Sequence, residues 1–146
     1  MVSLRLATIK DAKLLLAWRN DPLTREASRN SGEVPWENHV AWLEKSLLMS
    51  ERKLYIAEEA GVPVGTVRAD RLANGVQELS WTIAPEARGR GLAKEMVFLF
   101  VRKILPGESL LAVVKAGNTA SEKIAEALGL HPASPDTALD NLVEWR

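Results

Sequence analysis

Residues 77–93 have the sequence QELSWTIAPEARGRGLA, in which an alternating segment is followed by a glycine-rich junction. Leu79, Trp81 and Ile83 alternate with polar residues and predict a strand. The junction Arg88-Gly89-Arg90-Gly91-Leu92-Ala93 opens a predicted helix that ends near Ile104. Free amides at a helix N-terminus attract anions, and glycines let phosphate oxygens approach the backbone. The pattern favours a phosphate site, although an ordinary strand-to-helix turn with solvated arginines shows the same features.

Before this junction, alternating hydrophobic residues predict strands that are joined partly by tight turns. The predicted strands cover residues 3–9, 53–59, 62–72 and 77–84. Ala60-Gly61 and Asn74-Gly75 predict turns that make the last three strands antiparallel. Helical spacing predicts two helices after the first strand, at 11–18 and 35–47, with an irregular segment at 22–34.

After the junction, a strand, a helix and another strand are expected. The helix at 91–104 leads to a strand at 110–115, an order that predicts a parallel pair with a crossover. A helix capped by Asn118 or Thr119 follows, then a loop at 132–135 and a final strand at 139–145. The expected fold is one α/β (α+β) domain, with a mixed, mostly antiparallel sheet and helices on both faces.

Composition excludes several classes of function. The chain has 146 residues and 47% hydrophobic content, which suits one domain over residues 1–146. Lysine plus arginine and aspartate plus glutamate both count 19, so no overall field favours nucleic acid. Cysteine is absent, and His39 and His131 have no metal-ligand spacing, so no metal is expected. Signal-peptide features and long apolar runs are missing, which predicts a soluble, cytoplasmic protein with no membrane partner.

The junction resembles motif A of the GNAT (Gcn5-related N-acetyltransferase) family, Gln/Arg-x-x-Gly-x-Gly/Ala, with Arg88 first, Gly91 fourth and Ala93 sixth. Residues 78–85 resemble the family's fourth strand, and residues 114–121 resemble its later strand-to-helix junction. The resemblance implies a GNAT fold of about 6–7 strands with a splayed parallel pair. It also implies an enzyme that transfers acetyl from acetyl-CoA directly to a primary amine.

The same resemblance implies where acetyl-CoA, the co-substrate, binds. The cofactor is expected in the gap between the strands at 78–84 and 110–115. The implied cofactor-binding residues are Ile83, Arg88, Gly89, Arg90, Gly91, Leu92, Ala93, Asn118 and Lys123. For Asn118, a plain helix cap is the alternative role.

Two residues are the catalytic candidates. Glu78 is the candidate base for the arriving ammonium, with a structural or solvent-facing strand residue as the alternative. Many GNAT enzymes have a tyrosine proton donor where this chain has Ala125, so Ser121 is the candidate donor. An ordinary residue in the first helical turn is the alternative for Ser121. Val113 stands where some protein-acetylating relatives have glutamate, which argues against a protein N-terminus as substrate.

Residues 14–22, which include Trp18-Arg19-Asn20, and residues 35–43 resemble GNAT enzymes that acetylate amino sugars or ribosomal-protein N-termini. The implied substrate-side candidates are Arg19, Asn20, Glu33, Trp36 and His39. Core packing is the alternative for the tryptophan, and a structural hydrogen bond for the histidine. The predicted acceptor is a small-molecule amine or amino sugar, with protein amines second and a catalytically silent acyl-CoA-binding module as a third alternative. A homodimer through an exposed sheet edge is suggested by the same analogy.

Overall fold

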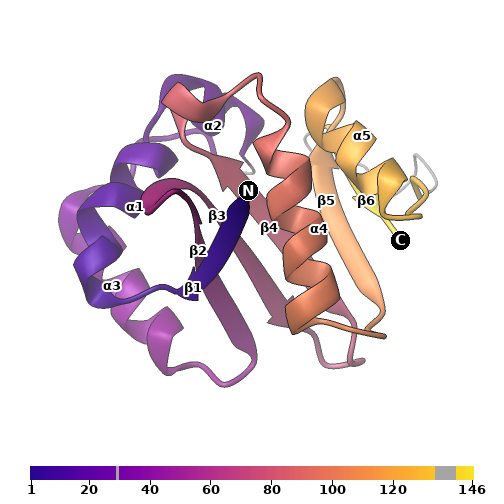
Figure 1. Cartoon of the computed structure of the whole chain (residues 1–146), viewed down its shortest axis with the longest axis horizontal. Coiled ribbons are helices and arrows are strands. Elements are labelled where there is room, and N and C mark those ends of the chain that lie inside the picture. Colours follow the sequence, from indigo (N-terminus) through magenta and orange to yellow (C-terminus); the bar gives the residue numbers. More distant parts are fainter. Residues whose placement is uncertain (29, 134–140) are drawn as a thin grey trace.

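The computed structural model describes residues 1–28, 30–133 and 141–146, which form an open sheet with helices on both faces (Figure 1). Its six strands are β1 (Val2–Leu6), β2 (Arg52–Glu59), β3 (Val62–Arg71), β4 (Gln77–Ile83), β5 (Leu110–Lys115) and β6 (Leu142–Trp145). The helices of the described residues are α1 (Ala12–Arg19), α2 (Pro22–Ala27), α3 (Trp36–Leu48), α4 (Leu92–Ile104) and α5 (Thr119–Ala127). Two short 3-10 turns are η1 (Ile9–Asp11) and η2 (Pro85–Ala87).

The strands lie in the sheet in the same order as in the chain, β1-β2-β3-β4-β5-β6. All neighbouring strands are antiparallel except β4 and β5, which are parallel and connected through α4. A parallel pair needs such a crossover because its strands start at the same edge of the sheet. The predicted mixed sheet with one parallel pair is therefore confirmed.

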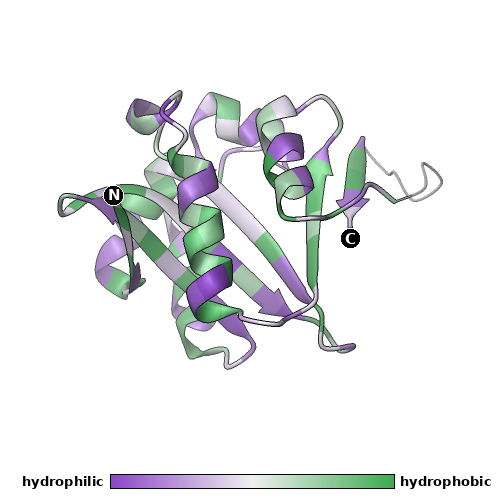
Figure 2. Cartoon of the chain, turned by 45° about the vertical axis from the view of Figure 1, so that its right-hand side comes forward, coloured by the Kyte–Doolittle hydropathy of each residue, from purple (hydrophilic) through white to green (hydrophobic). Residues whose placement is uncertain are grey.

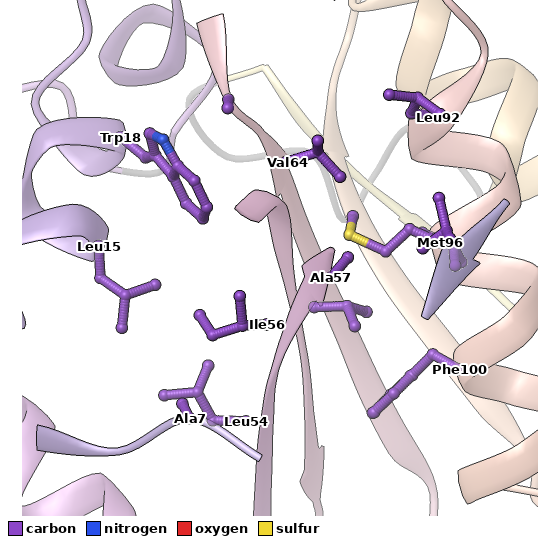
Figure 3. Close-up of a cluster of buried hydrophobic side chains, with 14 of the residues drawn as sticks. Ala7, Leu15, Trp18, Leu54, Ile56, Ala57, Val64, Leu92, Met96 and Phe100 are labelled. Atoms are coloured by element: carbon purple, nitrogen blue, oxygen red, sulfur yellow. The ribbon is translucent and has the colours of Figure 1, made fainter. Parts of the chain in front are cut away.

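The central strand β2 shows why both faces of the sheet carry helices. Its side chains alternate, with Leu54 and Ile56 on the face of α1 and Ala57 on the face of α4 (Figure 3). Tyr55 meets Phe100 of α4 edge to face, with 5.6 Å between ring centroids. Since both sets of side chains are buried or packed against the core, each face needs its own helical layer.

Helix α4 packs on the sheet through one apolar stripe. Leu92, Met96, Val97 and Phe100 are its buried residues, and their spacing places them on one side of the helix. Hydrophilic residues occupy other positions along α4, so the helix shows bands of both kinds in Figure 2. Gly65 of β3 lies beneath this helix, where an added Cβ would stand 3.0 Å from the Met96 sulfur.

One predicted irregular region contains a helix. Residues 22–34 were expected to lack regular structure, but α2 occupies Pro22–Ala27. The carboxylate of Asp21 accepts a hydrogen bond from the Thr24 amide at 3.2 Å, and Pro22 takes the first helical position. Asp and Pro at this junction therefore end one helix and start the next, because an N-cap followed by proline is also a helix start signal.

The first strand also ends earlier than expected. Thr8 lies within the strand predicted at 3–9, but it caps η1, forming a capping box with Asp11. Leu6, at the end of β1, is 63% exposed. For the final strand, β6 begins at Leu142, and residues 139–140 of the predicted strand and 134–135 of the predicted loop lie outside the described residues.

Candidate active site

The parallel strands β4 and β5 separate along their length. They pair only where Gln77, Glu78 and Leu79 face residues 110–112, and no pairing of the two strands continues beyond Leu79 in the described residues. Ile83, at the end of β4, instead pairs with Gly65 of β3. The predicted splay is thus present, and it leaves the edge of β4 near Ile83 available for a ligand.

The glycine-rich junction stands at the end of this splayed strand. Gly89 and Gly91 have φ angles of 79° and 74°, in the left-handed region that glycine adopts without strain. No side chain caps α4, and a Cβ placed on either glycine would meet no atom within 4 Å. The first amides of α4 have no partner within the helix, so this open backbone fits a phosphate.

The two arginines of the junction are engaged with carboxylates. Arg88 forms an ion pair with Asp21, the cap of α2, and Arg90 forms one with Glu59 at the end of β2. The hydrogen bond from Arg88 is the main reason that the pKa of Asp21 lies below its usual value. These pairs connect the junction to neighbouring elements, and direct contact of either arginine with phosphate stays a prediction.

Helix α5 starts after the C-terminal end of β5, the end at which β5 no longer pairs with β4. The side-chain oxygen of Asn118 accepts a hydrogen bond from the Ser121 amide at 3.3 Å, so the alternative role of helix cap is present. Ser121 is partly buried and Lys123 is exposed. Ala125 is fully buried, so its side chain belongs to the core. The cofactor and catalytic roles of Asn118, Ser121 and Lys123 stay predictions.

A cavity of about 310 Å³ lies between α1, α3 and the adjacent face of the sheet. The strand register explains its polar floor, because Thr66 is opposite Thr82 and Arg68 is opposite Ser80, so these side chains share one face. The aromatic side chains of Trp18 and Trp42 form other parts of the wall. Since Trp81 and Thr82 belong to β4, the cavity reaches the strand that borders the splayed gap.

Only two of the five substrate-side candidates line this cavity. Arg19 and His39 do so. The amide of Asn20 is instead hydrogen bonded to the backbone of Val34, donating to its carbonyl at 3.0 Å and accepting from its N–H at 2.8 Å. Glu33 is exposed, and Trp36, 49% exposed, does not line the cavity. Asn20 therefore positions the chain segment that brings Val34 to the cavity wall.

His39 is deeply buried, with 4% of its surface exposed. Its ring stacks on Trp42 with 5.8 Å between centroids, and burial lowers the pKa of the imidazole despite a hydrogen bond with the Ala12 backbone. The Nε2 atom has no hydrogen-bond partner among the described residues. A neutral imidazole with a buried nitrogen at a cavity is suited to accept a hydrogen bond from a ligand.

Glu78 shares the face of Ser80 and Thr82, as predicted, but does not line the cavity. It is half-buried and lies opposite Asp70 of β3. Sequence reasoning did not identify Arg68 or Trp42 as cavity residues. Alternation along β3 and the turn at Asn74-Gly75 could have placed Arg68 on the polar face, but Trp42 required the packing of α3 on the sheet.

Three features occur together at β4. Its parallel pairing with β5 opens into a splayed gap, a glycine-rich helix start follows its end, and one of its faces borders the cavity. The family model described as "Acetyltransferase (GNAT) domain" matches residues 2–131. The chain belongs to the GNAT family. It is a GNAT acetyltransferase, which transfers the acetyl group of the co-substrate acetyl-CoA.

Solved structures with the GNAT fold resemble the whole chain. A ribosomal-protein-alanine N-acetyltransferase from Brucella melitensis is 25% identical, with a TM-score of 0.79 and coverage of 98% of this chain and 97% of that one. A putative acetyltransferase from Salmonella typhimurium, solved with acetyl-CoA, is 20% identical, with a TM-score of 0.80 and coverage of 99% and 92%. Curated protein sequences gave no match.

The GNAT chain also lacks certain features within the residues that the structure describes. No helix there is long and apolar enough to cross a membrane. In the same residues, no group of three or more His, Asp or Glu side chains could hold a metal ion.

Proposed function

We propose that this GNAT enzyme acetylates a primary amine of a small molecule or amino sugar, and that the acceptor binds in the cavity between α1, α3 and the sheet. The observation that carries this proposal is the position of the cavity on β4. Trp81 and Thr82 line the cavity, and the same strand has its free edge at the splayed gap. An acceptor in the cavity would therefore lie beside the end of a cofactor in the gap.

Acetyl-CoA fits the residues of the gap and of the α4 N-terminus. Gly89 and Gly91 leave space for phosphate against the amides that begin at Leu92, and Ala93 has only a small side chain. The free edge of β4 at Ile83 provides backbone groups for the pantetheine arm. When bound, acetyl-CoA supplies the acetyl group as a thioester, which the acceptor amine takes while releasing a proton.

Two side chains are candidates for receiving that proton. Glu78 is our first candidate because it lies on the polar face of β4, two residues before Ser80. His39 is the alternative that the structure favours, because it lines the cavity and burial keeps its imidazole neutral at physiological pH. Ser121 is proposed to donate a proton to the departing thiolate.

The alternative acceptor is a protein N-terminus. Its support is the likeness to the Brucella ribosomal-protein-alanine N-acetyltransferase, which acts on protein amines by name. The small cavity favours the small-molecule acceptor, since about 310 Å³ is at the low end of the roughly 300–1,000 Å³ typical of ligand sites. A module that binds acyl-CoA without turnover is the third alternative.

Thiol release from acetyl-CoA tests the proposal directly, with amino acids, amino sugars, aminoglycosides, polyamines and short peptides as acceptors. Turnover on small amines supports the proposal, and turnover on peptides alone contradicts it. No turnover by a sample that binds CoA in calorimetry would favour the silent module. Glu78→Gln and His39→Gln are measured on the best acceptor. The variant of the true base should lose the acidic limb of the kcat/KM profile.

A further inference from the structure

The cavity wall contains positive charge without negative charge. Of its lining residues, Arg19 and Arg68 carry guanidinium groups, and no aspartate or glutamate of the described residues lines it. His39 adds no charge to this wall, because burial favours its neutral form. A ligand that enters this cavity therefore meets a local field that favours anions.

The two arginines differ in how their charges are balanced. Arg68 forms an ion pair with Asp70, with 3.3 Å between its Nε and the Asp70 Oδ2, and its guanidinium stacks on Trp42. Arg19 forms no ion pair with any described carboxylate. Its Nη2 donates a hydrogen bond to the Asn30 carbonyl at 2.7 Å, while its Nη1 is buried and has no hydrogen-bond partner in the described residues.

A half-buried guanidinium that has one buried donor and no described carboxylate partner is unfavourable for the protein alone. The pKa of Arg19 lies below its usual value, mainly because of burial and secondly because of the nearby positive charge of Arg25. Charged groups that leave water normally gain a partner or a hydrogen bond for each donor. Arg19 has a buried donor for which a ligand anion would be a suitable partner, because carboxylates and phosphates accept strong hydrogen bonds from arginine.

We infer that the acceptor is a small amine that also carries an anionic group, a carboxylate or a phosphate, and that Arg19 binds this group. Trp18 and Trp42 then pack against the uncharged part of the acceptor, which the apolar wall admits. Polycationic amines such as polyamines are poor acceptors because they would meet two guanidinium groups. The inference rests on the proposed function, in which this cavity holds the acceptor.

Matched pairs of amines test the inference, since each pair differs only in the anion. L-Leucine is compared with 3-methylbutan-1-amine, glucosamine 6-phosphate with glucosamine, and spermidine represents polycations. For the wild-type enzyme, kcat/KM should be about 10-fold to 100-fold higher for the anionic member of a pair, the range expected for a charge-assisted hydrogen bond. The leucine pair reports a carboxylate and the glucosamine pair a phosphate.

Arg19→Gln should remove this preference while acetyl-CoA affinity, measured by calorimetry, stays unchanged. Arg25→Gln is the matched control. It removes the same charge from a neighbouring residue that does not line the cavity and whose Nε donates to the Asn20 carbonyl. Arg19→Lys keeps the charge and should retain part of the preference, which covers the case in which the glutamine variant does not fold. Thermal melting of all variants reports folding.

Measurements of ligand binding, which need no turnover, test the inference independently of the proposed function. Quenching of tryptophan fluorescence compares N-acetyl-L-leucine with N-(3-methylbutyl)acetamide, and glucosamine 6-phosphate with glucosamine, because Trp18 and Trp42 line the cavity. Tighter binding of an anionic member that is lost in Arg19→Gln supports the inference even if no amine is acetylated. Equal or absent binding in both pairs, or a preference for neutral amines or spermidine, overturns it. In that event acetyl transfer to another amine could still be observed.

Discussion

Gly65 is the position where one added methyl group should disturb the fold most clearly. It lies in β3 opposite Ile83, beneath α4. A Cβ at this position would stand 2.8 Å from the Thr82 carbonyl oxygen and 3.0 Å from both the Ile83 Cδ1 and the Met96 Sδ. The carbonyl belongs to a paired strand and cannot rotate away as the end of a flexible side chain can.

We therefore expect Gly65→Ala to lower the free energy of unfolding. Overpacking costs about 1–3 kcal/mol, and the loss of glycine's freedom in the unfolded chain recovers about 0.4–1 kcal/mol. A net loss of about 1–2 kcal/mol corresponds to a fall in Tm of roughly 3–7 °C for a domain of this size. Urea denaturation and thermal melting measure both quantities.

Gly32→Ala is the matched control for this substitution. Its φ lies outside the left-handed region, and its added Cβ would meet only the Asn30 side chain, at 3.4 Å. The control should change stability by less than about 0.5 kcal/mol or raise it slightly. If Gly65→Ala were as stable as the control, β4 and α4 would tolerate a side chain between them, and the tight packing inferred from these distances would be refuted.

Two further predictions concern the cofactor site and acid stability. Gly91→Glu should weaken acetyl-CoA binding in calorimetry by about tenfold or more, because a carboxylate would occupy the anion position at the α4 N-terminus. Gly107→Glu, with the same φ of 74° and no atom within 4 Å of its Cβ, controls for backbone strain, and equal losses in both variants would contradict the site. Asp11→Asn should lose about 1–2 kcal/mol at neutral pH, since Asp11 accepts hydrogen bonds from both terminal nitrogens of the partly exposed Arg5 and from the Thr8 amide. The pairing with Arg5 holds the pKa of Asp11 below its value of 3.8 in the unfolded chain, so the stabilisation is complete above that pH and falls as the pH drops below it. The difference between the urea curves of wild type and Asp11→Asn should therefore shrink as the pH is lowered below 3.8, and a constant difference would argue against the charged pair.

Local patterns were sufficient to predict most of the fold. The strand 110–115 was predicted at its observed limits, and the helix at 91–104 at its observed end, because continuous apolar spacing and a Pro-Gly stop are local signals. Helix α2 was missed because Asp21 and Pro22 serve both as an end for α1 and as a start for α2. A segment of six residues is too short for helical periodicity to distinguish a helix from a turn.

The cofactor half of the site was easier to predict than the acceptor half. The junction that begins at Arg88 is one continuous segment, so its glycines and helix start were visible along the chain. The cavity is assembled from α1, α3 and three strands, and its residues are far apart in sequence. Of the substrate-side candidates that family resemblance implied, Arg19 and His39 line this cavity and Asn20, Glu33 and Trp36 do not, and their roles toward a substrate stay predictions.

The sequence by itself determined the element order, the parallel crossover and the glycine-rich helix start, because each depends on neighbours within a few residues. Only the tertiary structure decided the electrostatic roles of the arginines. Arg88 and Arg90 meet carboxylates from the α2 cap and from β2, and Arg68 meets Asp70, while Arg19 is half-buried at a cavity without a described carboxylate partner. Ion pairing depends on distances between side chains from separate elements, which the packing of those elements sets and no local pattern specifies.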